Sequence, residues 1–289
     1  MTATTATTAT SAARPTASAR LRRQPWDLYV AIAATAVFAL AALWPDLLAT
    51  QGAFTMDLAN TLQPPSAAHW FGTDEAGRDL YSRVIHGTAA SLGIGIGAAA
   101  VSLMLAVVLG SLAALGNRAT SAGVGWLLEV AFAFPALLLS LLLIAVLGPS
   151  ILTLILAVGI GTAPGYARMV RGQILGAKDS PYVEAAIALG HSRGRILRQH
   201  ILPNSLRPLV AVFALSIGQS IVWASSLSFL GLGIAPPAPE WGALLDAGRP
   251  YITVAGWLTV IPGVVIVLLA LTTTTLGRHL QSILEKGEK

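Results

Sequence analysis

The chain contains 289 residues, of which 55% are hydrophobic and 11% are charged, and its formal net charge is +5. Soluble domains usually carry about 25% charged residues, so this composition excludes an ordinary soluble protein. The sequence has no cysteine, which excludes disulfides, thiol catalysis and zinc sites built on cysteine. Because the apolar residues form runs long enough to cross a bilayer, we expect an integral membrane protein.

Residues 1–24 are mostly Thr, Ala and Ser, with several arginines before the first apolar run. This low complexity predicts a disordered cytoplasmic tail. A basic segment before an apolar run also resembles a secretory signal, and Ala39, Leu40 and Ala41 would suit a cleavage site. The run continues through Trp44 and further apolar runs follow, which favours a retained first span.

Six apolar segments approach the roughly 20 residues that a helix needs to cross a hydrocarbon core of about 30 Å. They cover residues 28–44, 89–115, 124–147, 151–167, 209–232 and 253–275. We therefore predict an all-α integral membrane protein with six transmembrane helices. Residues 25–88 would form the first span and an external loop with an interfacial helix. Residues 89–280 would form a five-helix core with a cytoplasmic loop over 168–206, followed by a cytoplasmic C-terminal tail over 281–289.

The distribution of basic residues predicts the orientation. An even number of spans places both termini on one side, together with Arg14, Arg20, Arg22, Arg23, Arg118, Arg168, Arg171, Lys178, Arg193, Arg195, Arg198, Arg207, Arg278, Lys286 and Lys289. The other side keeps Arg78, Arg83 and Arg249. The positive-inside rule then places both termini in the cytoplasm. Orientation and contact with anionic membrane lipid explain the basic surplus, so we expect no nucleic-acid partner.

The polar loop "EAAIALGHSRGRILRQHILPNS" interrupts this apolar sequence. Just before it, Ser180 and Pro181 are typical of a helix start. The residues that share one stripe of this helix are Tyr182, Ala185, Ala186 and Leu189. Gly190 suits a left-handed C-cap, Ser192 could cap a second helix, and Pro203 would end that helix. Such a helix pair would either insert into the groove of a partner protein or lie on anionic lipid.

Glu184-Ala185-Ala186, Gly190 and Leu202-Pro203 together resemble the cytoplasmic signature of permease subunits of bacterial ABC importers. The resemblance implies that the loop docks in a cleft of a separate ATPase subunit. The docking residues would be Tyr182, Glu184, Ala185, Ala186, Leu189, Gly190, Arg193, Leu202 and Pro203. The general pattern has an apolar residue at the position of His200, and the form "HILPN" resembles the peptide-importer branch.

The sequence contains no G-x-x-x-x-G-K-[ST] phosphate-binding loop, so we expect no ATPase site in this chain. The run Gly93, Gly95 and Gly97 lies inside a predicted span, where small residues support close helix packing. ATP and Mg²⁺ would therefore be bound by partner subunits. We expect no cofactor, metal site or catalytic residue in this chain.

The stretch "HWFGTDEAGRDLYSRVIHG" precedes the second predicted span. Thr73 could cap a helix whose first turn holds Asp74 and Glu75. Charged side chains of this helix would form ion pairs at i, i+4 spacing, as Asp74–Arg78 and Asp79–Arg83. Carboxylates so close together could instead bind a cation with a neighbouring histidine, but the adjacent arginines favour salt-bridged capping.

Further motifs near the external face are Gly72-Thr73-Asp74 with Gly77-Arg78-Asp79, and Ser226 to Gly233 with Pro236-Pro237 and Glu240-Trp241-Gly242. They resemble the oligopeptide/dipeptide branch, which also includes nickel importers, and within it the second, C-type permease. This resemblance implies a type I ABC importer permease bundle, a sister permease chain, two ATPase subunits and an external substrate-binding protein. It assigns an external gate or a contact with the binding protein to Gly72, Thr73, Asp74, Gly77, Arg78 and Asp79.

Glu129 lies near the cytoplasmic start of the third span, where the peptide branch usually carries an acid. An ionisable residue in a span predicts a role in gating or coupling, although an interfacial carboxylate at a helix end is an equal alternative. Its partner would be Arg118 or Arg168. The prolines expected to kink or break their spans are Pro135, Pro164 and Pro262.

The spans otherwise carry almost no charge, which favours a peptide substrate over a nickel ion. We therefore predict the permease of an ATP-driven importer for di- or oligopeptides in a bacterial inner membrane. Nickel or another small solute remains an alternative substrate. An ion-coupled secondary transporter would need an internal repeat or more buried carboxylates, and an intramembrane enzyme would need a catalytic constellation.

Overall fold

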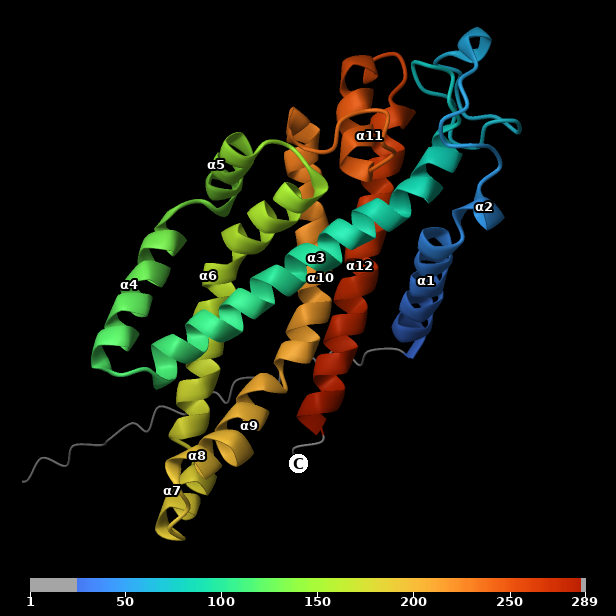
Figure 1. The fold of residues 1–289 in the computed structure, drawn as a ribbon. Coiled ribbons are helices and arrows are strands. Elements are labelled where there is room, and N and C mark those ends of the chain that lie inside the picture. Colours follow the sequence, from blue (N-terminus) through green and yellow to red (C-terminus); the bar gives the residue numbers. More distant parts are fainter. Residues whose placement is uncertain (1–24, 287–289) are drawn as a thin grey trace, which may run out of the picture.

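The computed structural model describes residues 25–286, and within them the chain folds as a bundle of helices (Figure 1). The long helices are α1 (Pro25–Leu43), α3 (Leu80–Leu115), α6 (Ile151–Lys178), α10 (Leu209–Leu227) and α12 (Trp257–Lys286). Among the described residues, five helical segments are long and apolar enough to cross a membrane, and the bent pair α4 (Arg118–Ala133) and α5 (Ala136–Leu147) adds a sixth if it is one span. The predicted all-α membrane fold is confirmed. The predicted tail over 1–24 and the end of the C-terminal tail, 287–289, lie outside the described residues.

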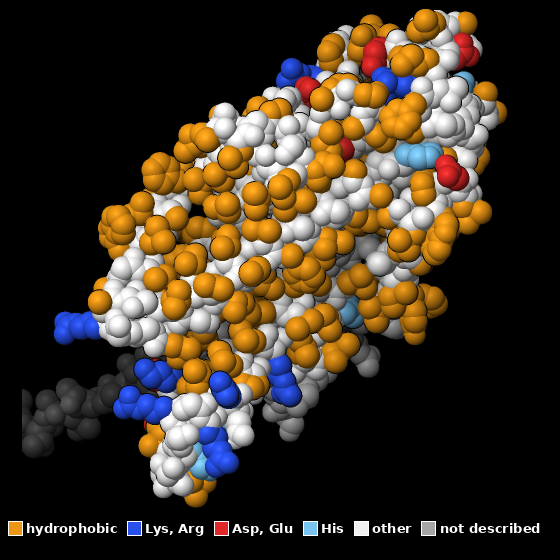
Figure 2. All heavy atoms as spheres, viewed as in Figure 1, with side chains coloured by type: hydrophobic (Ala, Val, Ile, Leu, Met, Phe, Trp, Pro, Cys, Tyr) orange, Lys and Arg blue, Asp and Glu red, His pale blue; other side chains and the backbone are white. Residues whose placement is uncertain are grey.

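Shorter helical elements lie at the two ends of the bundle, which we call the α7 end and the α11 end (Figure 1). The α7 end carries α7 (Pro181–Ala188), α8 (Arg193–Ile196), the π-helical turn η2 (Leu197–Ile201) and α9 (Leu202–Leu206). Toward the α11 end lie α2 (Pro45–Leu48), η1 (Leu58–Asn60), η3 (Ser228–Leu232), α11 (Trp241–Gly248) and η4 (Arg249–Tyr251). Figure 2 shows apolar side chains over the middle of the visible face and basic side chains gathered at the α7 end.

Proline affects the three predicted spans differently. Phe134 and Pro135 separate α4 from α5, and the two helices meet at an angle of 92°. Proline lacks the amide N–H and its ring crowds the preceding turn, so a break at this position is expected. Pro164 and Pro262 lie inside α6 and α12, and neither proline ends its helix. Of the breaks expected from these prolines, the structure contains the one at Pro135.

Small residues allow the long helices to approach closely. A Cβ atom on Gly95 of α3 would lie 2.1 Å from Cγ1 of Ile221 in α10, and one on Gly110 would lie 2.7 Å from the carbonyl oxygen of Ala167 in α6. Both distances are too short for any larger residue. The predicted packing role is thus confirmed for Gly95, whereas a Cβ on Gly93 would meet nothing within 4 Å.

The segment before α3 does not form the helix expected from Thr73. The side chain of Asp74 accepts hydrogen bonds from the backbone amides of Ala76 and Arg78, both at 2.9 Å, and thereby closes a turn. Gly77 has φ +71, and a Cβ there would lie 1.7 Å from the carbonyl oxygen of Asp57. Asp74 bonds the amides that a helix would use, and Gly77 takes a left-handed conformation, so α3 begins later, at Leu80.

Buried ion pairs hold this turn against the start of α3. Asp74 accepts a bond from Nε of Arg78 at 2.7 Å and a second bond from Nη1 of Arg83. Arg83 also donates to the carbonyl oxygen of Pro237 at 3.1 Å, which links the turn to the segment before α11. The expected Asp79–Arg83 pair is therefore wrong. Asp79 instead caps α3, because its carboxylate accepts from the amide of Ser82 at 2.9 Å.

A buried carboxylate also starts α11. Glu240 is 1% exposed, and its two carboxylate oxygens accept bonds from the amides of Gly242 and Ala243, each at 2.8 Å. The next residue, Trp241, is fully buried and donates from Nε1 to the carbonyl oxygen of Val84 in α3 at 2.9 Å. The N-terminus of α11 is therefore fixed to α3 by both residues.

We expect Asp74→Asn to lower the stability of the folded chain by about 3 kcal/mol or more, because it leaves Arg78 and Arg83 buried without their shared counter-charge. The midpoint of thermal unfolding of the purified complex in detergent measures the change. Glu75→Gln is the matched control, since Glu75 pairs with Arg78 at 2.9 Å but its side chain is 33% exposed. Its effect should stay below about 1 kcal/mol. Equal losses in the two variants would contradict this account.

The pH dependence of the free energy of unfolding should show the raised pKa of the Glu240 carboxyl. Burial raises the pKa of its carboxyl above the ordinary value of 4.5, although the backbone bonds from Gly242 and Ala243 oppose the shift. The folded chain then keeps this proton at pH values where the unfolded chain has lost it. Stability should therefore fall as pH rises from 4.5 toward the raised pKa. Unfolding midpoints of the wild type and Glu240→Gln, which cannot titrate, should diverge in this window in favour of the variant. A constant difference would show that the pKa is not raised.

Candidate functional site

The predicted docking loop is a compact group of short helices at the α7 end. Helix α6 continues past the predicted end of its span to Lys178, and α7 begins at Pro181 as expected. Ser180 precedes α7, but its hydroxyl donates to the carbonyl oxygen of Ala177 at 2.5 Å and does not cap the helix. The predicted side-chain cap at Ser180 is therefore wrong, because the end of α6 uses that hydroxyl.

Gly190 forms the corner of the loop, as predicted. Its φ is +76, in the left-handed region that side chains other than glycine rarely adopt, and a Cβ there would meet nothing within 4 Å. The amide of the next residue, His191, donates to the carbonyl oxygen of Ala186 at 3.1 Å and closes the end of α7. Backbone conformation, and not crowding, is thus the reason for glycine at this corner.

The second helix of the loop is longer than expected. Ser192 caps α8 as predicted, because its hydroxyl accepts from the amide of Arg195 at 3.4 Å. The chain then passes through the π-helical turn η2 into α9 and continues helically beyond Pro203. The expected end at Pro203 is wrong. This proline is the second residue of α9 and directly follows the π-helical turn η2 and Leu202.

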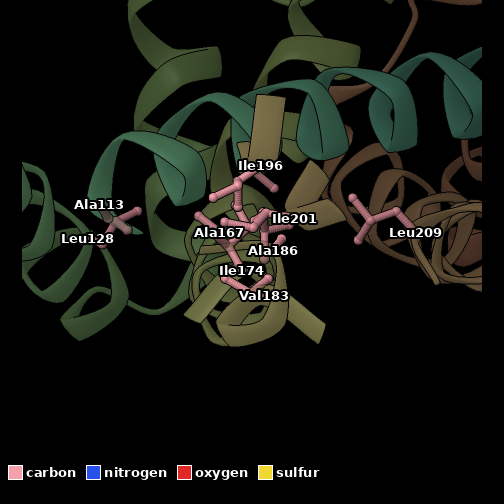
Figure 3. Close-up of a cluster of buried hydrophobic side chains, with 11 residues drawn as sticks. Ala113, Leu128, Ala167, Ile174, Val183, Ala186, Ile196, Ile201 and Leu209 are labelled. Carbon is pink, nitrogen blue, oxygen red and sulfur yellow. The ribbon is translucent and has the colours of Figure 1, made fainter. Parts of the chain in front are cut away.

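A buried apolar cluster fixes the loop to the bundle (Figure 3). Val183 and Ala186 are 3% and 4% exposed and form the buried face of α7. They belong to one cluster with Ile174 of α6 and with Ile196 and Ile201. The same cluster reaches α3, α4 and α10 through Ala113, Leu128 and Leu209. The loop therefore shares one buried cluster with α3, α4, α6 and α10.

The other residues of α7 and the following Leu189 are exposed, and several of them carry large apolar side chains. Within the predicted stripe, Tyr182 is 42% and Leu189 is 76% exposed, whereas Ala186 faces the buried cluster. Ile187, which the sequence did not single out, is 60% exposed. Glu184 and Ala185 are also exposed. Arg193, Arg195 and Arg198 of the following segment are exposed as well, and Figure 2 shows basic side chains gathered at this end of the molecule.

Glu129 lines a cavity of about 390 Å³ between α4 and α6, together with Arg118 and Arg171. Among the described residues Glu129 forms no ion pair. Arg168, one of its two expected partners, instead lies 4.2 Å from the centre of the Phe132 ring. Arg118, the other expected partner, lines the same cavity without an ion pair to Glu129 in the described structure, and Arg171 is a basic residue there that sequence reasoning missed.

The predicted external residues come together at the α11 end, far from the docking loop (Figure 1). They form the single turn closed by Asp74 and extended to the cap at Asp79, and they are Gly72, Thr73, Asp74, Gly77, Arg78 and Asp79. The two histidines considered as cation ligands contact carboxylates: His69 lies 3.1 Å from Asp79, and His86 lies 3.1 Å from Asp46. Most of these side chains are buried, so their first role is to shape the turn.

Sequence comparisons place this architecture among known proteins. Residues 106–286 match the family described as binding-protein-dependent transport system inner membrane component. The chain is 36% identical over 252 residues to a dipeptide transport system permease protein of Alkalihalophilus pseudofirmus, covering 87% of this chain and 83% of that protein. It is 41% identical over 239 residues to a probable D,D-dipeptide transport system permease protein of Escherichia coli, covering 82% and 80%. It is also 38% identical over 247 residues to a glutathione transport system permease protein of Pectobacterium atrosepticum, covering 84% and 81%.

Solved structures share the fold. An amino acid ABC transporter superimposes with a TM-score of 0.58 at 16% identity, over 69% of this chain and 93% of that chain. The methionine ABC transporter in an inward-facing conformation superimposes with a TM-score of 0.57 at 18% identity, over 70% of this chain and 95% of that chain. The expected type I importer bundle is thus confirmed. The chain therefore belongs to the family of binding-protein-dependent transport system inner membrane components, and it is an oligopeptide/dipeptide-type permease subunit of an ABC importer.

Proposed function

We propose that this permease imports di- or oligopeptides together with a sister permease chain, and that two separate ATPase subunits drive it through the loop around α7. The observation that carries the proposal is an exposed apolar tip on a loop that is otherwise firmly packed. Tyr182, Ile187 and Leu189 present large apolar side chains to the surroundings. Large apolar side chains exposed together with charged residues at the end of a loop mark an interaction site. An apolar cleft in the ATPase subunit would cover this tip, and Arg193 would reach its rim.

The charges at the α7 end support a cytoplasmic location for this tip. Basic residues of the last turns of α6 and of the loop lie there, including Lys178, Arg195 and Arg198. Positively charged segments remain on the cytoplasmic side of a membrane. ATP and Mg²⁺ would then be bound on the same side, by the partner subunits, and the hydrolysis would be theirs. Both termini of this chain would also lie in the cytoplasm.

The buried cluster under α7 explains how movement of an ATPase could reach the membrane. Val183 and Ala186 pack with Ile174 near the end of α6, so a displaced α7 would carry α6 with it. The spans would then alternate between inward- and outward-facing arrangements. Glu129 lines its cavity beside α6 and would respond to the same movement.

The turn at the α11 end would meet the external substrate-binding protein or form an external gate. Arg83 connects this turn to the segment before α11 through Pro237, so contact with a binding protein would be transmitted to both. The substrate class rests on the relatives, whose names include dipeptide, D,D-dipeptide and glutathione transport. All of these solutes contain peptide or peptide-like amide groups.

Replacing Gly190 tests the docking loop. Gly190→Val should strain the left-handed corner by about 1–3 kcal/mol and displace α7, so ATP hydrolysis should no longer respond to the loaded binding protein. Gly190→Asn is the matched control, because asparagine tolerates this conformation, and its response should be retained. Both variants are compared in assembled complexes of equal yield. A normal response in Gly190→Val would contradict the docking role.

The substrate is tested by ATP-driven uptake into proteoliposomes that hold this chain, the sister permease, the ATPase subunits and the binding protein. Labelled di-, tri- and pentapeptides and nickel form the panel. We expect uptake of a peptide class that disappears when this chain is omitted. Uptake of nickel alone would refute the peptide assignment, and ATP-independent uptake by this chain alone would refute the importer mechanism.

A further inference from the structure

A groove runs along α6 from the α4–α5 break toward the α7 end. Its upper part is a cavity of about 690 Å³, lined among others by Phe132, Phe134, Tyr166, Gln219 and Trp223. Its lower part is a cavity of about 900 Å³, whose polar lining includes Gln173, Asn204 and Arg207. Met169 lines both cavities, so the two parts lie next to each other along α6.

A polar pair lies in the upper cavity. The Tyr166 hydroxyl of α6 donates to Oε1 of Gln219 in α10 at 2.8 Å, which fixes the direction of the amide. Gln219 is exposed, and its Nε2 has no hydrogen-bond partner among the described residues. An amide facing lipid at this depth would lose its hydrogen bonds with water. This face is therefore expected to border water, substrate or another protein chain.

The chemistry of the lining matches a peptide better than an ion. None of the described residues that line the upper cavity is charged. Its donors and acceptors are an amide and hydroxyl groups, which pair with the N–H and C=O groups of a peptide bond. The aromatic walls, Phe132, Phe134 and Trp223, offer apolar contact without demanding one side-chain shape.

Glycines keep the lower part of the groove open. Gly172 and Gly176 of α6 line it, and a Cβ on either would meet nothing within 4 Å. Packing within this chain does not require glycine at these positions, although glycine inside a helix costs about 1 kcal/mol relative to alanine. Glycine at both positions leaves room for a substrate or another chain to approach α6.

We propose that Tyr166 and Gln219 form a subsite in the translocation path that binds the peptide groups of the passing substrate. This inference rests on the proposed import of peptides and deepens it. Oε1 of Gln219 and the Tyr166 hydroxyl would accept a peptide N–H, and Nε2 of Gln219 would donate to a peptide carbonyl.

Uptake by the full complex in proteoliposomes tests the subsite. In Gln219→Leu and Tyr166→Phe we expect about fivefold to tenfold less peptide transported per ATP hydrolysed, the effect of one hydrogen bond lost to the substrate. ATP hydrolysis should still respond to the loaded binding protein, because the docking loop is intact. Ser226→Ala is the control on the same helix, since its hydroxyl lines a different cavity. Uptake within twofold of wild type in both variants would overturn the proposal.

Thiol labelling provides a second measurement that does not depend on the rate of transport. The chain has no cysteine, so Gln219→Cys introduces its single thiol. We expect a water-soluble reagent to label it, and peptide under turnover to slow labelling. Met104→Cys is the control, because Met104 is 72% exposed on α3 and lines neither part of the groove. Absence of labelling at Gln219→Cys, or labelling unaffected by peptide, would refute the subsite. These outcomes can be told apart from failure of the proposed function itself, because in that case the wild-type complex would import no peptide.

Discussion

Close packing of α3 against α6 is the contact on which the rest of the described chain depends. Gly110 of α3 lies against the backbone of α6, where a Cβ would be 2.7 Å from the carbonyl oxygen of Ala167. From the other side, a Cβ on Gly159 of α6 would lie 2.7 Å from Val101 of α3. Membrane helices gain little from the hydrophobic effect against one another, so such close contact is a main source of their association. The start of α3 carries the turn at the α11 end, and the end of α6 carries the docking loop.

Charged residues are distributed unevenly between the turn at the α11 end and the upper part of the groove. The ion pairs of Asp74 with Arg78 and Arg83 lie in the turn before the span, where they hold a loop in place. The upper part of the groove has no charged lining residue among those described, and its polarity comes from neutral groups such as Tyr166 and Gln219. Fixed charges in this turn and neutral polarity in the upper part of the groove suit a permease that does not hold its substrate tightly.

Sequence patterns predicted the features that depend on local chemistry or on long apolar runs. The long apolar helices, the break at Pro135 and the left-handed corner at Gly190 belong to this group. The helix expected at Thr73 failed because the Asp74 side chain bonds two nearby amides, a competition that spacing alone does not decide. The exposed face of α7 was also only partly predicted. Every residue of α7 except Glu184 is apolar or small, so composition does not show which residues are buried. Contacts with Ile174 and Ile201, which lie outside α7, decide that Val183 and Ala186 are the buried ones. The Tyr166–Gln219 pair joins two helices and left no local signal.

The π-helical turn η2 sets the rotational phase between the docking loop and the groove. Ile196 and Ile201 are both 6% exposed and share one buried cluster, although residues five apart on an α-helix point about 140° away from each other. The amide of Leu202 donates to the carbonyl oxygen of Leu197, five residues earlier, which brings both isoleucines to the same side. A π turn is geometrically an α-helix with one residue inserted, so everything after it is rotated by about 100° relative to a regular helix. That single residue determines which side of α9 carries Asn204 into the groove, and how Arg207, just after the helix, is directed. The loop and the groove are therefore aligned by helical phase, and a chain one residue shorter here would turn a different face of α9 toward the groove.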